Sequence, residues 1–425
     1  MASESTGLKD PTKLNAIGIF SLALMGMGFS VTTPAMSSIV AQFASTGANV
    51  SLLSQAYAFT MVPCVLIAGL LVGNKVRYKW VAFFGTLMMT IFGFLPAVLP
   101  NPDFTTLIVC RALFGVGIGI MNPVGKGLIL AIYGGNRQAT FMGLYTTFTN
   151  LGGIIFQQAG GWLAGADAAM GWKLHYFGYL ICIIGVIGSL FLPDPPVTAK
   201  TVSKDSAEAH GKLGAACFIV GIFILFVNLV NQPVFMGASI FVRNILTVGG
   251  SATAASSAPI IAAQAMTLYT VVGMVIGAVY GLIFKALGRW VAPLGMFCGA
   301  LGAFFISLAG GEGGQLWMVF AGTCMLGVGF AFILPAAFQI VGIHTSKIRV
   351  GLATAITIAL MNCATFLSSY WLQALAGGNA AAAMSVSTLT HSAFIGIFIY
   401  LVMGIILVVF NPFKKRGAAA KAEAK

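Results

Sequence analysis

The chain has 425 residues, of which 59% are apolar and only 7% are charged, and its mean hydropathy is +0.97. A soluble domain carries roughly 25% charged residues, so this composition excludes a water-soluble globular protein and predicts one that is surrounded mostly by lipid. The net charge of +13 falls in short clusters between long apolar runs, as orientation signals do, and this excludes a nucleic-acid-binding surface.

Twelve apolar runs follow one another along the chain, and each approaches or exceeds the roughly 20 residues that cross a bilayer as a helix. The first run is too long for the apolar region of a cleavable signal peptide. We therefore expect an all-α, multi-pass protein of a bacterial cytoplasmic (inner) membrane, with twelve transmembrane helices. The runs cover residues 14–40, 50–72, 80–99, 105–133, 139–163, 174–193, 213–240, 258–284, 290–309, 316–341, 351–376 and 389–411.

The fourth run carries the two basic residues that we place inside the membrane, Arg111 and Lys126. At 100° per residue, Arg111, Asn122 and Lys126 fall on one helix face, and the two basic residues are about 22 Å apart along the axis. All nine acidic residues lie in predicted loops, tails or helix ends. Two buried cations without buried anions predict a path for an anion. Two alternatives stay open: Arg111 bonds the backbone carbonyls of neighbouring helices, and Lys126 reaches out to the membrane interface.

Uncharged polar residues in other runs are further candidates for a binding site. On the seventh run Asn228, Asn231 and Gln232 stand at i, i+3 and i+4 on one helix face, and Pro233 removes a backbone hydrogen bond beside them. We expect this face to line a site; the alternative is that its amides only join neighbouring helices. The remaining candidates, from the fifth, eighth and eleventh runs, are Tyr145, Asn150, Gln264, Tyr269, Asn362 and Tyr370.

The longest polar interruption divides the runs six and six, and the two halves repeat each other. Seven pairs of identical residues align at one offset of 212 residues, which indicates duplicated six-helix bundles. The pairs are Gly69 with Gly281, Arg77 with Arg289, Gly115 with Gly327, Gly117 with Gly329, Pro123 with Pro335, Arg137 with Arg349, and Asn150 with Asn362. The expected parts are an N-terminal bundle (1–193), a cytoplasmic linker (194–212), a C-terminal bundle (213–411) and a basic cytoplasmic tail (412–425).

Three motifs resemble those of the major facilitator superfamily. The loop after the second run, Gly69-Leu-Leu-Val-Gly-Asn-Lys-Val-Arg77-Tyr-Lys79, resembles the family's G-x-L-a-D-r-x-G-r-r signature. A second copy after the eighth run reads Gly281-Leu-Ile-Phe-Lys-Ala-Leu-Gly288-Arg289. The fourth run contains Arg111-Ala-Leu-Phe-Gly115-Val-Gly117, which is similar to the family's R-x-x-q-G-x-g element.

The chain also departs from the family pattern. The family's loop signature carries an acidic residue, and both copies in this chain lack it, with Gly73 and Lys285 in its place. The missing carboxylate implies a gate held by backbone, glycine packing and other partners. In the fifth run Phe156 and Gln157 replace the Gly-Pro of the family's antiporter element, which weakens any inference of drug antiport. The resemblance implies gate roles for five residues: Gly69, Arg77, Gly281, Gly288 and Arg289.

The resemblance implies two pseudo-symmetric six-helix bundles that expose a central site to each side of the membrane in turn. Orientation follows from charge: placing both termini in the cytoplasm leaves every basic residue there except Arg111, Lys126, Lys173 and Arg243, as the positive-inside rule predicts.

We expect a secondary transporter that moves a small organic anion of the carboxylate type by symport or exchange. The candidate coupling ion is a proton. It would travel with the substrate, bound either to His175 or to the anion itself. The alternative is efflux or uptake of a neutral or cationic hydrophobic compound; a remote alternative is a membrane receptor that transports nothing. No catalytic constellation, metal-site spacing or nucleotide-binding loop is visible, so no enzymatic activity and no cofactor are expected. The expected partners are the substrate and the lipid bilayer, and the chain is expected to be a monomer.

Overall fold

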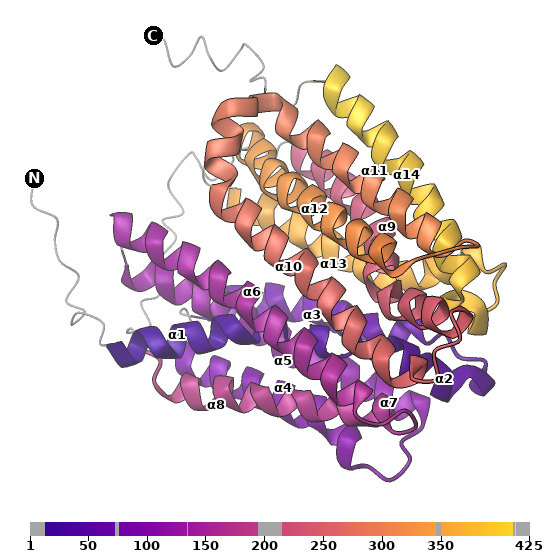
Figure 1. Ribbon diagram of the computed structural model, residues 1–425. Helices are drawn as coiled ribbons and strands as arrows, with labels where there is room; N and C mark the ends of the chain where they lie inside the picture. The colour runs from indigo at the N-terminus through magenta and orange to yellow at the C-terminus, as the bar shows by residue number, and fades with distance from the viewer. Residues whose placement is uncertain are drawn as a thin grey trace, which may run out of the picture. The chain divides into compact units, whose positions relative to one another are not determined.

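The computed structural model describes residues 13–72, 76–133, 135–193, 215–345, 350–410 and 413. Every element within these ranges is a helix, and one isolated bridge joins Val72 to Val76 (Figure 1). The predicted linker (194–212) and the basic residues of the predicted tail (412–425) lie outside the described residues.

The chain divides into two compact units. Unit 1 comprises Met1–Phe43, Leu52–Val202 and Ala255–Ala263, and unit 2 comprises Ala44–Ser51, Ser203–Ala254 and Gln264–Lys425. Each unit is therefore built mostly from one half of the sequence. The domain bounds expected from the sequence stay a prediction.

Unit 1 is built from the helices of the first half. In it α4 packs against α5, η3 and α8, while α1 packs against α6 and α8. The elements are α1 (Lys13–Met25), η1 (Gly28–Val31), α2 (Met36–Phe43), α3 (Ser51–Leu71), α4 (Tyr78–Val98), α5 (Phe104–Ile132), α6 (Gly135–Gly165), α7 (Gly171–Leu174), η3 (His175–Cys182) and α8 (Ile183–Leu190).

Unit 2 is built mostly from the helices of the second half, and α10 belongs to it from Gln264 onward. Its α11 packs against α12 and α14, and its α9 packs against α12, α13 and α14. The elements are α9 (Ala215–Val248), α10 (Ala254–Leu287), η5 (Gly288–Trp290), α11 (Val291–Ala309), α12 (Leu316–His344), α13 (Val350–Leu375), η6 (Ala381–Met384) and α14 (Val386–Val409).

Eight stretches of the described residues are long and apolar enough to cross a membrane, and one of them, Ala254–Ala309, covers both α10 and α11. α6 and α13 are 31 and 26 residues long but are not among these stretches. The presence of several membrane-spanning helices is therefore supported. The count of twelve stays a prediction.

The first predicted span is not one continuous helix. α1 ends at Met25, a short 3₁₀ helix follows, and α2 begins at Met36. Gly26 and Gly28 lower the local helix propensity, and Pro34 disfavours helical backbone in the residue before it. The sixth predicted span stays one helical stretch, Gly171–Leu190, with 3₁₀ geometry over the eight residues of η3. Apolar periodicity alone did not reveal the break in the first span or the 3₁₀ segment in the sixth.

Large apolar side chains stay exposed on both units. Among them are Phe59 at 63%, Trp162 at 61%, Leu282 at 68% and Ile405 at 63% of their surface. A water-soluble protein rarely exposes apolar patches of this kind, whereas a bilayer accepts them.

Candidate functional site

Arg111 lies in the first half of α5, with only 4% of its surface exposed. Its Nη1 donates a hydrogen bond to the Tyr179 hydroxyl. Its Nη2 donates to the backbone carbonyl oxygens of Phe29, at 2.7 Å, and of Ser54, at 3.5 Å. The Tyr179 hydroxyl in turn bonds with the Thr32 hydroxyl at 3.0 Å. Arg111 therefore joins α5 to three other segments of unit 1.

Aromatic rings surround the same guanidinium. Its central carbon lies 5.1 Å from the ring centroid of Tyr57, 5.2 Å from that of Phe114 and 5.9 Å from that of Tyr179. Such cation–π contacts are worth most where water is excluded. The bonding to backbone carbonyls that the sequence left open as an alternative for Arg111 is thus present. The role of Arg111 in substrate binding stays a prediction.

His175 is fully buried at the start of η3, and its ring centroid lies 4.0 Å from that of Tyr176. Neither nitrogen of the imidazole has a hydrogen-bond partner among the described residues, and neither does Nε of Arg111. Buried polar atoms without partners are uncommon in folded proteins. The first unit therefore contains a polar cluster that is only partly satisfied.

Lys126 is placed quite differently from Arg111. It lies in the last two turns of α5 with its side chain exposed, and it makes no hydrogen bond within the described parts of the chain. Asn122, one turn earlier on the same helix, is partly buried. The two basic residues of the predicted face are thus separated: one is bonded inside unit 1 and the other is exposed on its surface.

The two candidates of α6 are also unlike each other. Tyr145 is 4% exposed and packs against α5 at Gly125, where an added Cβ would lie 2.4 Å from a ring carbon of Tyr145. This is a helix-packing position. Asn150 is partly buried and forms no side-chain hydrogen bond to any residue that the structure describes.

The amides of α9 form a polar cluster in unit 2. Nδ2 of Asn228 donates to the backbone carbonyl of Met361, at 2.8 Å, and to the hydroxyl of Thr365, at 2.7 Å, both on α13. Nε2 of Gln232 donates to Oδ1 of Asn228 at 3.3 Å, which confirms that these two residues share a helix face. Asn228 therefore joins helices, as the alternative interpretation of this face expected.

Asn231 is different, because part of its amide has no partner. It is 4% exposed, and its Nδ2 donates to the Tyr269 hydroxyl on α10 at 3.3 Å. Its Oδ1 is buried and accepts no hydrogen bond from the described residues. The Tyr269 ring lies 5.3 Å from Phe235 and 6.4 Å from Phe330. The structure thus brings Asn231 and Tyr269 together beside aromatic rings, with one acceptor open.

Three further candidates of unit 2 lie outside this hydrogen-bonded cluster. Nδ2 of Asn362 bonds the carbonyl of Ile358 in its own helix at 2.9 Å. Tyr370 is 48% exposed and packs edge-on against Phe366. Gln264 is exposed on α10.

The five predicted gate residues lie at helix ends or on exposed positions. An added Cβ would meet nothing within 4 Å at Gly69 or Gly281. Gly288 ends α10 with φ of +52°, a backbone conformation that favours glycine. Arg77 precedes the first residue of α4, and the guanidinium of Arg289 lies 4.8 Å from the Trp290 ring centroid.

The sequence did not identify the residues that contact Arg111 in unit 1 and Asn228 in unit 2. Tyr57 and Tyr179 surround Arg111, and Thr365 binds Asn228, but none of them belongs to a motif. One signal was available, since Tyr57 and Tyr269 are related by the same 212-residue offset as the seven aligned pairs. Both tyrosines lie in the polar clusters of their own units.

Comparison with known proteins places these features in a family. Residues 18–369 match the family profile described as Major Facilitator Superfamily. The chain is 25% identical over 239 residues to the multidrug efflux protein YfmO of Bacillus subtilis (strain 168), a match that covers 54% of this chain and 58% of that protein. It is 27% identical over 219 residues to the multidrug transporter protein MdtP of the same organism, covering 51% of this chain and 36% of that protein. These matches span less than two thirds of each relative.

Solved structures show the same fold over nearly the whole chain. The nucleoside transporter NupG superposes with a TM-score of 0.69 at 14% identity, covering 96% of this chain and 100% of that one. A D-xylose-proton symporter superposes with a TM-score of 0.65 at 18% identity, covering 94% and 96%. Since the matched family profile covers most of the sequence and the fold agrees, the chain belongs to the Major Facilitator Superfamily.

Proposed function

We propose that this chain is a secondary transporter of the cytoplasmic membrane that works by alternating access. Twelve spans in two bundles, with both termini in the cytoplasm, would expose one substrate site to each side in turn. Membership of the superfamily supports this proposal, as do the names of the relatives, a multidrug transporter and a multidrug efflux protein. Neither enzymatic activity nor a resident cofactor is part of the proposal.

The proposed substrate is a small organic anion, and the observation that carries this is the exposed Lys126. No described helix contains Asp or Glu, so no carboxylate on these helices balances this cation. A charged group within a membrane span is costly and usually serves a transport path. Since Arg111 is already bonded to backbone and tyrosine, Lys126 carries the attraction for the anion.

Within unit 2, the polar cluster of Asn231 and Tyr269 offers a hydrogen-bond acceptor to a substrate. The open Oδ1 of Asn231 can accept one hydrogen bond, so a substrate with a hydroxyl or N–H group would satisfy an atom whose isolation costs about 1–3 kcal/mol. The ring of Tyr269 beside it would contact an apolar part of the substrate. A substrate that carries both a donor group and an apolar part fits this cluster of unit 2.

A second candidate is efflux of a neutral or cationic hydrophobic compound. Arg111 is sequestered in unit 1, and the cluster around Asn231 and Tyr269 is uncharged and rich in aromatic rings. The names of the relatives, multidrug and quinolone resistance proteins, agree with this candidate.

Transport by Lys126 variants in proteoliposomes tests the anion proposal. We expect Lys126→Gln to lower kcat/KM for labelled hydroxy- and amino-carboxylates by about tenfold or more, the equivalent of ~1.4 kcal/mol. Lys126→Arg should keep most of the activity because it keeps the charge. Lys13→Gln, at the first residue of α1 and outside the motifs, is the matched control and should transport like the wild type.

The same assay separates the two candidates. Undiminished carboxylate transport by Lys126→Gln would reject the cationic site. If the wild type moves hydrophobic cationic dyes but none of the carboxylates, the second candidate is correct.

A further inference from the structure

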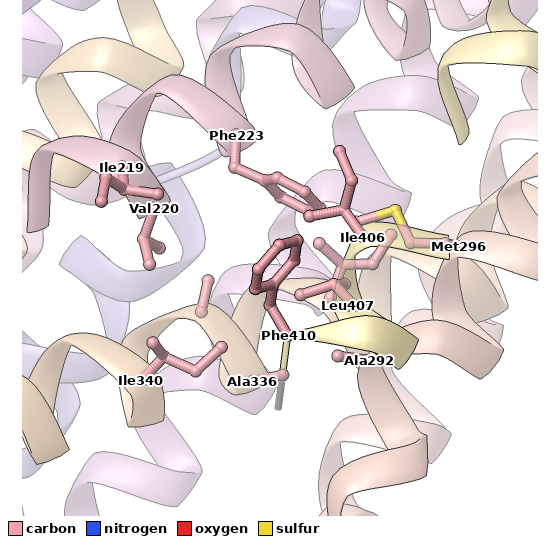
Figure 2. A pocket seen from close by; sticks show the side chains of 12 residues that line it. Ile219, Val220, Phe223, Ala292, Met296, Ala336, Ile340, Ile406, Leu407 and Phe410 are labelled. Atoms are coloured by element: carbon pink, nitrogen blue, oxygen red, sulfur yellow. The ribbon is translucent and has the colours of Figure 1, made fainter. Parts of the chain in front are cut away.

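An apolar pocket of about 140 Å³ lies within unit 2, away from the amide cluster. It is formed by the first turns of α9 and α11, the second half of α12 and the end of α14 (Figure 2). All of its lining side chains are apolar, and the sticks in Figure 2 show carbon and a single sulfur. A dry apolar cavity of similar size can hold a guest as large as benzene.

The pocket opens on the outer surface of the unit and reaches into its interior. Ile219 and Phe410, on its rim, are 66% and 70% exposed. Met296 and Ala336, at its floor, are each 1% exposed. The lining and the exposed rim are both apolar, so the chemistry of the pocket suits a lipid acyl chain.

Basic residues gather at the same end of these helices. Arg289 precedes the pocket residue Ala292 by three positions. The ring of Phe413, which follows α14, lies 5.5 Å from that of Phe284, and Phe284 directly precedes Lys285. Two described basic residues, Lys285 and Arg289, therefore accompany this end of the apolar pocket.

We propose that this pocket binds an acyl chain of an anionic phospholipid whose head group lies against Lys285 and Arg289. Burying methylene groups in the pocket is favourable at about 0.8 kcal/mol each, and basic residues near the membrane surface attract anionic head groups. A transported substrate fits less well, since its polar groups would find no partner among these side chains. The site is therefore regulatory or structural, and it does not depend on what the chain transports.

Binding is measured on the purified full-length protein in a neutral detergent. Phosphatidylglycerol and phosphatidylcholine with identical acyl chains are titrated while bound lipid is counted by native mass spectrometry. We expect phosphatidylglycerol to bind in a one-to-one complex and to raise the apparent melting temperature, as a ligand of the folded state does. Phosphatidylcholine should bind more weakly, because its head group carries no net charge.

Location is tested with a phosphatidylglycerol that carries a photoreactive diazirine near the end of one acyl chain. Cross-links should map to peptides containing Ile219–Phe223 or Ile406–Phe410 in the wild-type protein. This readout needs no variant, so it holds even where a substitution disturbs folding. Cross-links found only on other helices would overturn the proposal.

Variants separate the contributions of charge and shape. Lys285→Gln with Arg289→Gln should weaken phosphatidylglycerol binding by about thirtyfold, from ~1 kcal/mol for each basic residue. Arg243→Gln, near the other end of α9, is the control and should change it by less than about twofold. Ala336→Leu should abolish binding of both lipids by filling the floor. Equal affinity for the two lipids, unchanged in the double variant, would reject an anionic-lipid site.

Discussion

Arg111 shows how a charged side chain is accommodated inside a membrane span. It lies 4% exposed between a tyrosine hydroxyl, two backbone carbonyls and three aromatic rings. Each of these partners replaces part of the hydration that burial removes. A guanidinium suits this position because its planar set of N–H groups can donate hydrogen bonds in several directions at once.

Arg111→Lys should therefore destabilise unit 1 rather than only change substrate affinity. The ammonium keeps the charge but cannot reach the Tyr179 hydroxyl and the Phe29 carbonyl together, so about 1–3 kcal/mol of stability should be lost. Melting of the detergent-purified protein, followed by size-exclusion chromatography, measures this, with the exposed Arg137→Lys as the control. An unchanged melting temperature together with a raised KM for anions would assign Arg111 to the substrate site instead.

At the scale of helices, the two halves repeat one close contact. An added Cβ at Gly115 of α5 would lie 2.3 Å from the carbonyl oxygen of Tyr57 on α3, and one at Gly327 of α12 would lie 2.7 Å from that of Tyr269 on α10. Both members of each pair are related by the 212-residue offset. The internal repeat found in the sequence therefore recurs as a repeated helix–helix contact, which requires glycine because backbone approaches backbone.

Gly115→Ala should lower the folded yield and melting temperature, since the methyl group would also lie 2.2 Å from the Thr60 hydroxyl. Overpacking of this kind costs about 1–3 kcal/mol. Gly327→Ala should cost less, because its nearest contact is longer. Gly143→Ala on α6 is the control, since an added Cβ there meets nothing within 4 Å. Equal stability of all three variants would contradict the close helix contacts.

At the scale of the whole chain, the placement of basic residues determines the expected orientation. Nearly all of them occupy one predicted side of the membrane, and the apolar segments between them are long enough to span it. Because translocating clustered Lys and Arg is unfavourable, the clusters are expected to stay in the cytoplasm.

Reporter fusions test this orientation directly. Green fluorescent protein fused after Lys425, or inserted in the linker after Lys204, should fluoresce, because it folds on the cytoplasmic side. Alkaline phosphatase inserted after Gly313, between α11 and α12, should be active, because it needs the outer side. The reverse pattern at all three sites would contradict the orientation, and a dark fusion after Lys425 beside a fluorescent one after Lys204 would contradict an even number of spans in the second half.

Much of the fold could be predicted because its signals can be read directly from the order of residues. Apolar runs of sufficient length recur along the chain and repeat at a constant offset, and the long helices α9, α12 and α14 lie where these runs predicted them. Apolar length did not predict the break in the first run or the 3₁₀ segment in the sixth. Gly26, Gly28 and Pro34 were a local signal for the break, whereas Tyr179 of η3 bonds to Thr32 and Arg111, which are distant in the sequence.

The sequence by itself determined the membrane environment, the helical class, the duplication and the superfamily. Hydropathy, charge placement, motif spacing and the repeat offset can all be read from the order of residues along the chain. Only the tertiary structure decided which polar residues are already bonded. It placed Arg111 among carbonyls and rings, left Lys126 exposed and left one atom of Asn231 without a partner. These outcomes depend on which helices pack together, and packing joins residues that are far apart along the chain.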